Sequence, residues 1–97
     1  MTMLPEPLAF EWDEGNIEKN FITHGVTNKE AEAVFTNKPF LVSLDVKHSE
    51  KEKRLQALGK TDEGRQLFIV FTIRKQKVRV VSARDMNRKE KAIYEKV

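Results

Sequence analysis

The chain has 97 residues, a formal net charge of +3 at pH 7 and no cysteine, which suits one small domain over residues 1–97 with residues 1–7 as a loose N-terminal leader. The lack of cysteine excludes disulfides and thiolate metal sites, and two histidines far apart in the sequence argue against zinc, so we expect neither a metal ion nor another cofactor. No segment approaches the length of a membrane span, and we expect a cytoplasmic protein.

The beginning of the chain predicts a strand followed by a helix. Leu8–Trp12 is a short apolar run typical of a strand. Asp13 is then a suitable N-cap for a helix over residues 14–24, and Gly25 is a natural end for it. We expect the packed face of this helix to contain Ile17, Phe21 and either Ile22 or His24.

Two further helices are marked by capping-box patterns, in which a polar N-cap residue is followed three positions later by glutamate. Thr27-Asn-Lys-Glu30 opens the second helix of the chain. Asn87-Arg-Lys-Glu90 has the same form and predicts a final helix over about residues 88–96.

Between these helices the apolar residues change to a period of two, which predicts four strands. They are Phe40–Val46, a stretch around Lys53–Lys60, Gln66–Arg74 and Lys77–Ala83. Lys75-Gln76 is short enough for a tight hairpin, which implies antiparallel pairing. The order β-α-α-β-β-β-β-α therefore predicts an α+β fold, a small antiparallel sheet with helices packed on one face and the other face partly open.

Charge is distributed unevenly along the chain. Residues 1–46 carry three basic and eight acidic residues, whereas residues 47–97 carry fifteen basic and seven acidic residues. A basic half on a compact domain is typical of a protein that binds a polyanion. A solvated, lysine-rich surface without an acidic ligand would have the same composition, so charge alone leaves both interpretations open.

Strand alternation suggests where the polar side chains of the basic half point. Arg54, Gln56 and Lys60 share one face of their strand, which is either a surface for RNA or the charged side of an edge strand. In the last strand, regular alternation puts Arg79 and Arg84 on opposite sides. Only a bulge or the strand end could bring both to one site, and we favour Arg84 because strand ends beside loops carry accessible side chains.

A basic surface that binds RNA could also cleave it, if it carries the necessary groups. Cleavage needs a group that accepts the proton of the 2′-hydroxyl, stabilisation of the phosphorane and a proton for the leaving 5′-oxygen. Arginine suits the second task because its planar fork donates paired hydrogen bonds to phosphate and stays charged. His48 suits the proton transfers by its ordinary pKa, although a loop histidine bound to backbone would look the same. Tyr94 could protonate a phosphate oxygen or simply pack its ring, and Glu52 could act as a base or pair with a lysine.

Several segments together resemble the BrnT family, the ribonuclease toxins of bacterial type II toxin–antitoxin systems. They are Phe10-Glu-Trp-Asp13, Asn20 with His24-Gly-Val26, Glu30-Ala with Val34-Phe35, the polar run from Asp45 through His48 and Arg54 to Gly59, Val78 to Arg84, Glu90 and Tyr94. The resemblance implies a RelE-like fold and metal-independent endoribonuclease activity that stops translation. It also implies a BrnA-like antitoxin with a ribbon-helix-helix DNA-binding part. The complex would contact operator DNA only through this antitoxin, and no membrane partner is expected.

The residues and the resemblance lead to one set of site predictions. The expected catalytic residues are His48, Arg54, Arg84 and Tyr94, and the expected RNA-binding residues are Lys60, Arg74, Arg79, Ser82 and Arg88. The competing hypothesis is a non-catalytic basic module that holds an acidic protein or a nucleic acid without cutting it.

Overall fold

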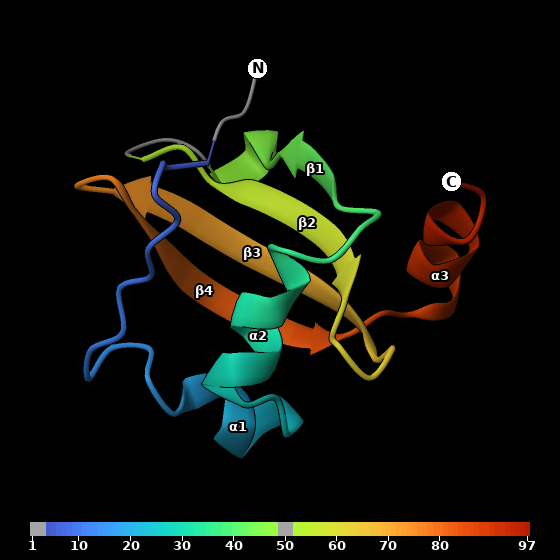
Figure 1. Cartoon of the computed structure of the whole chain (residues 1–97), viewed down its shortest axis with the longest axis horizontal. Coiled ribbons are helices and arrows are strands. Elements are labelled where there is room, and N and C mark those ends of the chain that lie inside the picture. The colour runs from blue at the N-terminus through green and yellow to red at the C-terminus, as the bar shows by residue number, and fades with distance from the viewer. Residues whose placement is uncertain (1–3, 49–51) are drawn as a thin grey trace.

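The computed structural model describes residues 4–48 and 52–97, within which three α-helices accompany a four-stranded antiparallel sheet (Figure 1). The helices are α1 (Lys19–His24), α2 (Asn28–Val34) and α3 (Arg88–Tyr94). The strands lie side by side in chain order as β1 (Leu41–Leu44), β2 (Leu55–Lys60), β3 (Gln66–Arg74) and β4 (Lys77–Asp85), with a 3-10 turn, η1 (Val46–His48), after β1. The predicted α+β class and element order are confirmed.

The first predicted strand, Leu8–Trp12, is reduced to a single bridge against β4. Phe10 pairs in parallel with Val78, whose backbone N–H donates to Ala9 O at 2.8 Å and whose carbonyl accepts from Glu11 N at 2.8 Å. Of the expected leader, residues 1–3 lie outside the described residues, and Leu4 packs against the core. The N-terminal segment thus borders the outer edge of β4.

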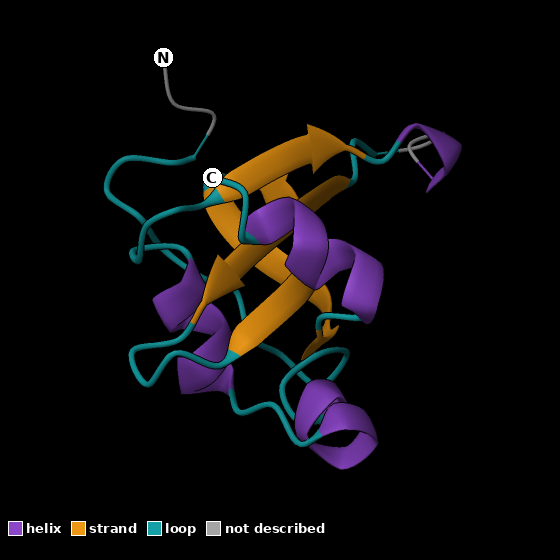
Figure 2. Cartoon of the chain, turned by 90° about the vertical axis from the view of Figure 1, so that its right-hand side faces the viewer, coloured by secondary structure: helices purple, strands orange, loops and turns teal. Residues whose placement is uncertain are grey.

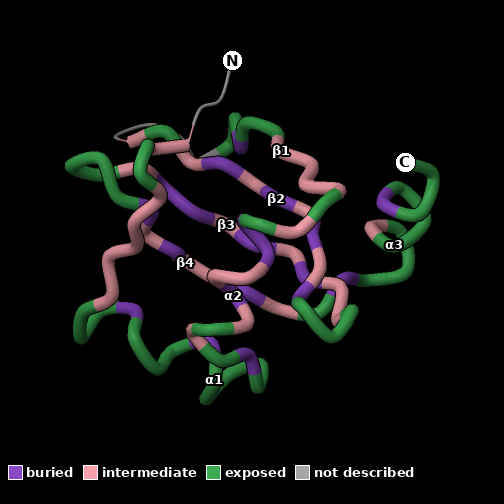
Figure 3. The backbone as a smooth tube through the Cα atoms, in the orientation of Figure 1, coloured by how far each residue is buried: buried purple, intermediate pink, exposed green. Residues whose placement is uncertain are grey.

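One face of the sheet is covered by α2, and the core lies between them (Figures 1 and 2). Phe71, Leu67 and Ile69 of β3 are completely buried, and in Figure 3 the buried stretches follow β2, β3 and β4 beneath α2. Fully burying side chains of this size stabilises the fold by roughly 1.5–3 kcal/mol each. The helix packs so closely that a Cβ placed on Gly59 would lie 2.5 Å from Val34 Cγ1.

The expectation for α1 is wrong in two respects. The helix begins at Lys19 instead of residue 14, because the chain from Asp13 first forms turns in which Asp13 Oδ1 accepts from Gly15 N. The apolar residues expected on its packed face are also exposed: Ile17, in the turn before the helix, by 44%, Phe21 by 61% and Ile22 by 78%.

The reason is that α1 docks against the edge of β4 and uses amides to do so. Asn16 Nδ2 donates to Val80 O at 3.2 Å, and Asn20 Oδ1 accepts from Ala83 N at 2.9 Å. These buried side chains satisfy backbone groups that an edge strand otherwise leaves unpaired. The buried side of α1 is therefore polar, which an apolar pattern cannot reveal.

A β-bulge in β4 changes the alternation expected for that strand. Val70 of β3 pairs with Ser82, but the next residue, Phe71, pairs with Val80, so Val81 is the additional residue. Before the bulge, Arg79 pairs with Thr72 of β3, and after the bulge, Arg84 pairs with Phe68. Thr72 and Phe68 are four positions apart and therefore lie on the same face of β3. Arg79, Ser82 and Arg84 consequently share the face opposite the core, hereafter the open face.

The final helix, α3, begins with the predicted capping box, in which Asn87 Oδ1 accepts from Glu90 N at 2.8 Å and the Glu90 carboxylate accepts from Asn87 N at 2.9 Å. Glu90 and Ile93 of α3 line a hollow together with Phe68, so the helix lies beside the open face at the end of the sheet where β4 finishes. None of the described helices exceeds seven residues, and none of them could cross a membrane.

Candidate functional site

Three arginines from three strand ends meet on the open face, and we call Arg54, Arg74 and Arg79 the arginine cluster. Arg54 directly precedes β2, Arg74 ends β3 and Arg79 lies near the start of β4. All three line a hollow of about 200 Å³, together with the side chains of Lys19, Glu52 and Thr72. Antiparallel pairing explains the convergence, because the start of β2, the end of β3 and the start of β4 lie at the same end of the sheet.

The β3–β4 hairpin fixes the spacing between two members of the cluster. Lys75 and Gln76 both have positive φ angles, 52° and 63°, as a two-residue type I′ hairpin requires. The predicted tight hairpin is thus confirmed. It keeps Arg74 and Arg79 on the same face across neighbouring strands.

Carboxylates hold two of the guanidinium groups in place. Arg74 Nε and Nη2 donate to the two oxygens of Glu52 at 3.1 and 3.0 Å, and the Arg74 guanidinium lowers the pKa of Glu52 below its usual range. Arg79 donates to Glu11 at 3.0 Å and to both oxygens of Asp13 at 2.8 and 3.0 Å, which lowers the pKa of Asp13. Four cationic side chains and one carboxylate line the hollow itself, so it favours an anion.

A buried hydroxyl group in the hollow has no hydrogen-bond partner. Thr72 is 2% exposed, pairs with Arg79 across the sheet and lines the hollow, yet its Oγ1 makes no hydrogen bond. Such a group costs free energy in the folded state and is uncommon in native proteins. A ligand oxygen bound by the arginine cluster would give this hydroxyl a partner.

Thr72, Lys19 and Gly15 were missed by sequence reasoning. Thr72 lies within an apolar run, and only its pairing with Arg79 identifies its location. Lys19 belongs to a segment whose docking was predicted wrongly. A Cβ on Gly15 would fall 2.8 Å from Arg79 Nη2, so a larger residue here would shift the guanidinium from its present place, which no local pattern indicates.

Arg84, expected to be catalytic, lies farther along the open face. Its guanidinium carbon is 4.2 Å from the centroid of the Phe68 ring, and Nη1 and Nη2 donate to Glu90 at 2.8 and 2.9 Å. Phe68 and Thr72 are four residues apart on β3, which corresponds to about 13 Å. Arg84 is therefore outside the arginine cluster.

Tyr94, the other expected catalytic residue of the C-terminal region, is engaged elsewhere. It is 4% exposed, its hydroxyl donates to Pro39 O at 2.7 Å, and burial raises its pKa. This contact fastens α3 to the segment before β1, so the hydroxyl of Tyr94 already has a structural role.

The remaining predicted residues are distributed around the sheet. Ser82 lies on the open face beside the bulge, between the arginine cluster and Arg84. Lys60 ends β2 at the far end of the sheet, where its carbonyl accepts from Asn37 Nδ2 at 3.0 Å, and Arg88 is exposed at the start of α3. His48 ends η1, and its side chain lies outside the described part of the chain.

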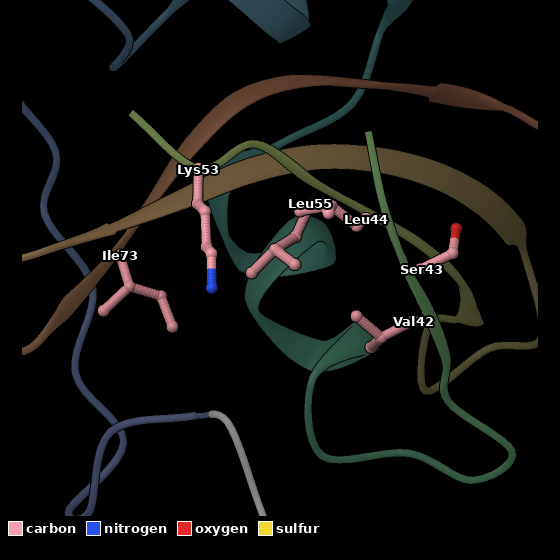
Figure 4. A pocket seen from close by; sticks show the side chains of 6 residues that line it. All are labelled: Val42, Ser43, Leu44, Lys53, Leu55 and Ile73. Carbon is pink, nitrogen blue, oxygen red and sulfur yellow. The ribbon is translucent and has the colours of Figure 1, made fainter. Parts of the chain in front are cut away.

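A larger hollow of about 520 Å³ lies between β1, β2 and β3 on the core side of the sheet (Figure 4). Val42, Leu55 and Ile73 give it an apolar wall, and Lys53 extends between Ile73 and Leu55. With one ammonium group and no guanidinium, it offers much less to a phosphate than the arginine cluster does. We therefore take the arginine cluster as the candidate functional site.

Within residues 4–48 and 52–97, no three His, Cys, Asp or Glu side chains are grouped so that they could hold a metal ion. No individual curated protein matches the chain. A family model described as the ribonuclease toxin BrnT of type II toxin–antitoxin systems matches residues 12–90, a range that includes the whole arginine cluster and all four strands. The chain therefore belongs to the BrnT family, the ribonuclease toxins of type II toxin–antitoxin systems, and this family type implies an antitoxin partner.

Proposed function

We propose that the arginine cluster binds the scissile phosphate of RNA and stabilises the transition state of strand cleavage without a metal ion. The observation that carries this proposal is the meeting of three arginines around a hollow that is also lined by Thr72, whose buried hydroxyl has no hydrogen-bond partner. In the reaction, the 2′-oxygen attacks the phosphorus and loses its proton, and the bond to the 5′-oxygen breaks as that oxygen gains a proton. The products are a 2′,3′-cyclic phosphate and a free 5′-hydroxyl.

The arginine cluster supplies charge where the phosphorane develops it. Arg74 and Arg79 are already oriented by Glu52, Glu11 and Asp13, so little side-chain entropy is lost when they meet phosphate. The N–H donors that these guanidinium groups do not spend on the carboxylates can reach the non-bridging oxygens, and the Thr72 hydroxyl would donate to one of them. Oriented donors of this kind are typically worth about 10²- to 10³-fold in rate each.

Proton transfer needs a group that titrates near neutrality. Glu52 is poorly suited because its pairing with Arg74 keeps its pKa low, and we assign it the positioning of Arg74. We retain His48 as the general acid or base, since its ordinary pKa fits and it precedes Glu52, in the wall of the hollow, by only four residues.

The proposal extends to the partner and the setting. We infer that the antitoxin is a BrnA-like protein with a ribbon-helix-helix part, that operator DNA is bound only through it, and that the toxin cuts RNA in the cytoplasm to stop translation. A positively charged cleavage site is well suited to inhibition by an acidic antitoxin segment that occupies it.

The decisive experiment incubates partner-free protein with a defined RNA in the presence of EDTA. We expect cleavage with a 2′,3′-cyclic phosphate end and none when the 2′-hydroxyl at the cut is removed. Arg74→Lys and Arg79→Lys keep the charge but lose the fork, and should reduce kcat by about 10²-fold or more. Lys89→Ala, which removes an exposed cation on α3, is the matched control and should leave kcat unchanged. Salt-sensitive binding without products would contradict cleavage and favour the non-catalytic basic module.

A further inference from the structure

A second hollow lies on the open face, beyond the bulge from the arginine cluster. It has a volume of about 300 Å³, at the lower end of the range of roughly 300–1,000 Å³ for small-ligand sites. Leu58 of β2, Phe68 of β3 and Ile93 of α3 form its apolar wall, and Gln56 and Ser43 add polar groups. Glu90 also lines it, and its carboxylate is paired with the Arg84 guanidinium. We call it the Phe68 hollow.

The aromatic ring in this hollow is held in a fixed position. The Arg84 guanidinium lies over the Phe68 ring at 4.2 Å, within the range of a cation–π contact, and Glu90 fixes that guanidinium with two hydrogen bonds at 2.8 and 2.9 Å. Phe68 is only partly buried, whereas Leu67, Ile69 and Phe71 of the same strand are buried in the core. A partly exposed, immobilised ring beside an arginine is a suitable surface for a planar heterocycle to stack on.

The distance to the arginine cluster suits one RNA strand. The hollow and the cluster share one face of the sheet, about 13 Å apart along β3, and the row between them contains Ser43, Gln56, Val70 and Ser82. That row carries no acidic side chain that would repel a phosphodiester. A nucleotide next to a phosphate held by the cluster could therefore place its base in the Phe68 hollow.

We propose that the Phe68 hollow is a nucleobase subsite that contributes to cleavage specificity, an inference that rests on the proposed function. The base stacks on Phe68 against Leu58 and Ile93, and the Gln56 amide, which offers both a donor and an acceptor, reads its edge. Continuity with the phosphate site favours RNA over an apolar side chain of the antitoxin as the occupant. Arg84 acts here as a positioning residue that keeps the ring in place.

The test combines substrate and protein changes. A set of RNA oligonucleotides carries an abasic site at each position around the cut, and kcat/KM is measured for wild type and Phe68→Leu. For wild type, one abasic position should reduce kcat/KM by about 5- to 100-fold. For Phe68→Leu, removal of the same base should cost less than about threefold, because the stacking partner is already absent.

Controls separate stacking from a general loss of folding or activity. Phe21→Leu removes an aromatic ring that is 61% exposed on α1 and does not line the Phe68 hollow, and it should keep the full wild-type abasic profile. Gln56→Leu should change which base is preferred at the sensitive position while stacking persists. Thermal unfolding of each variant shows that the compared proteins are folded.

Each outcome distinguishes this inference from the proposed function. If wild type cleaves but the abasic penalty is the same in Phe68→Leu, the subsite is refuted and cleavage stands. If Phe68→Leu instead weakens antitoxin binding and leaves the abasic profile unchanged, the hollow belongs to the protein partner, which also refutes the subsite. If wild type cuts nothing, the proposed function fails. The subsite is then tested by Kd in place of kcat/KM: an abasic penalty in wild type that is lost in Phe68→Leu supports it, and an equal penalty in both refutes it.

Discussion

Replacing Thr72 with valine should make the protein more stable and less active at the same time. The side chain keeps its shape, and the only loss is a hydroxyl group that is buried, 2% exposed as a residue, and without a partner. Removing an unpaired buried hydroxyl should raise the free energy of unfolding by about 1–3 kcal/mol. A hydrogen bond to a charged phosphorane oxygen is worth about 1.5–3 kcal/mol, so kcat/KM should fall by about 10- to 100-fold.

Thr61 provides a matched control for that substitution. It is also a buried threonine, 3% exposed, but its Oγ1 accepts from Arg65 N at 3.0 Å and it does not line the arginine hollow. Thr61→Val should therefore lower the free energy of unfolding by about 1–3 kcal/mol, because it strands a donor, and leave kcat/KM unchanged. Urea denaturation and RNA cleavage by Thr72→Val, Thr72→Ser and Thr61→Val make the comparison, with Thr72→Ser retaining most activity. If Thr72→Val is neither stabilised nor slowed, the reasoning about the unpartnered hydroxyl is refuted.

Two further predictions concern stability. Gly59→Ala should lower the free energy of unfolding by about 1–3 kcal/mol in urea titrations, because its Cβ would fall 2.5 Å from Val34 Cγ1, and an unchanged midpoint would contradict the close packing of α2 on β2. Arg65 pairs with Asp85 at 2.7 Å and with Glu30 at 3.2 Å. The pKa of Asp85 is lowered chiefly by Arg65, and that of Glu30 is lowered by the Thr27 backbone N–H and then by Arg65. A lowered folded-state pKa adds stability that is present above the ordinary values near 4 and lost as the pH falls through the depressed ones. The urea midpoint of wild type should therefore drop more between pH 6 and pH 3 than that of Arg65→Met, and an equal drop in both would refute this role.

Local patterns were sufficient for much of the fold. Both capping boxes form as predicted, with Thr27 Oγ1 accepting from Glu30 N at 3.1 Å in α2. The period of two identified β3 and β4, and the short Lys75-Gln76 connection gave their hairpin. These features depend on residues a few positions apart, whose preferences act before any tertiary contact forms.

The candidate site depends on features that no local window contains. Regular alternation predicted that Arg79 and Arg84 lie on opposite faces, whereas the bulge at Val81 puts both on the open face. The bulge lies next to the backbone groups of β4 that Asn16 and Asn20 bind. The sequence nevertheless favoured Arg84 over Arg79 for the site. Only the register across β2, β3 and β4 determines which strand ends meet.

The ion pairs of Arg79 connect the beginning of the chain to its last strand. They join residues 66 and 68 positions apart, so most of the polypeptide must be synthesised before Asp13 and Glu11 can orient this arginine. Translation delivers the N-terminal acids first and the last strand near the end. If the proposed function is right, a nascent chain that lacks its last strands cannot form the phosphate-binding site. The toxin would then become active only when its synthesis is nearly complete, which leaves that time for an antitoxin to be present.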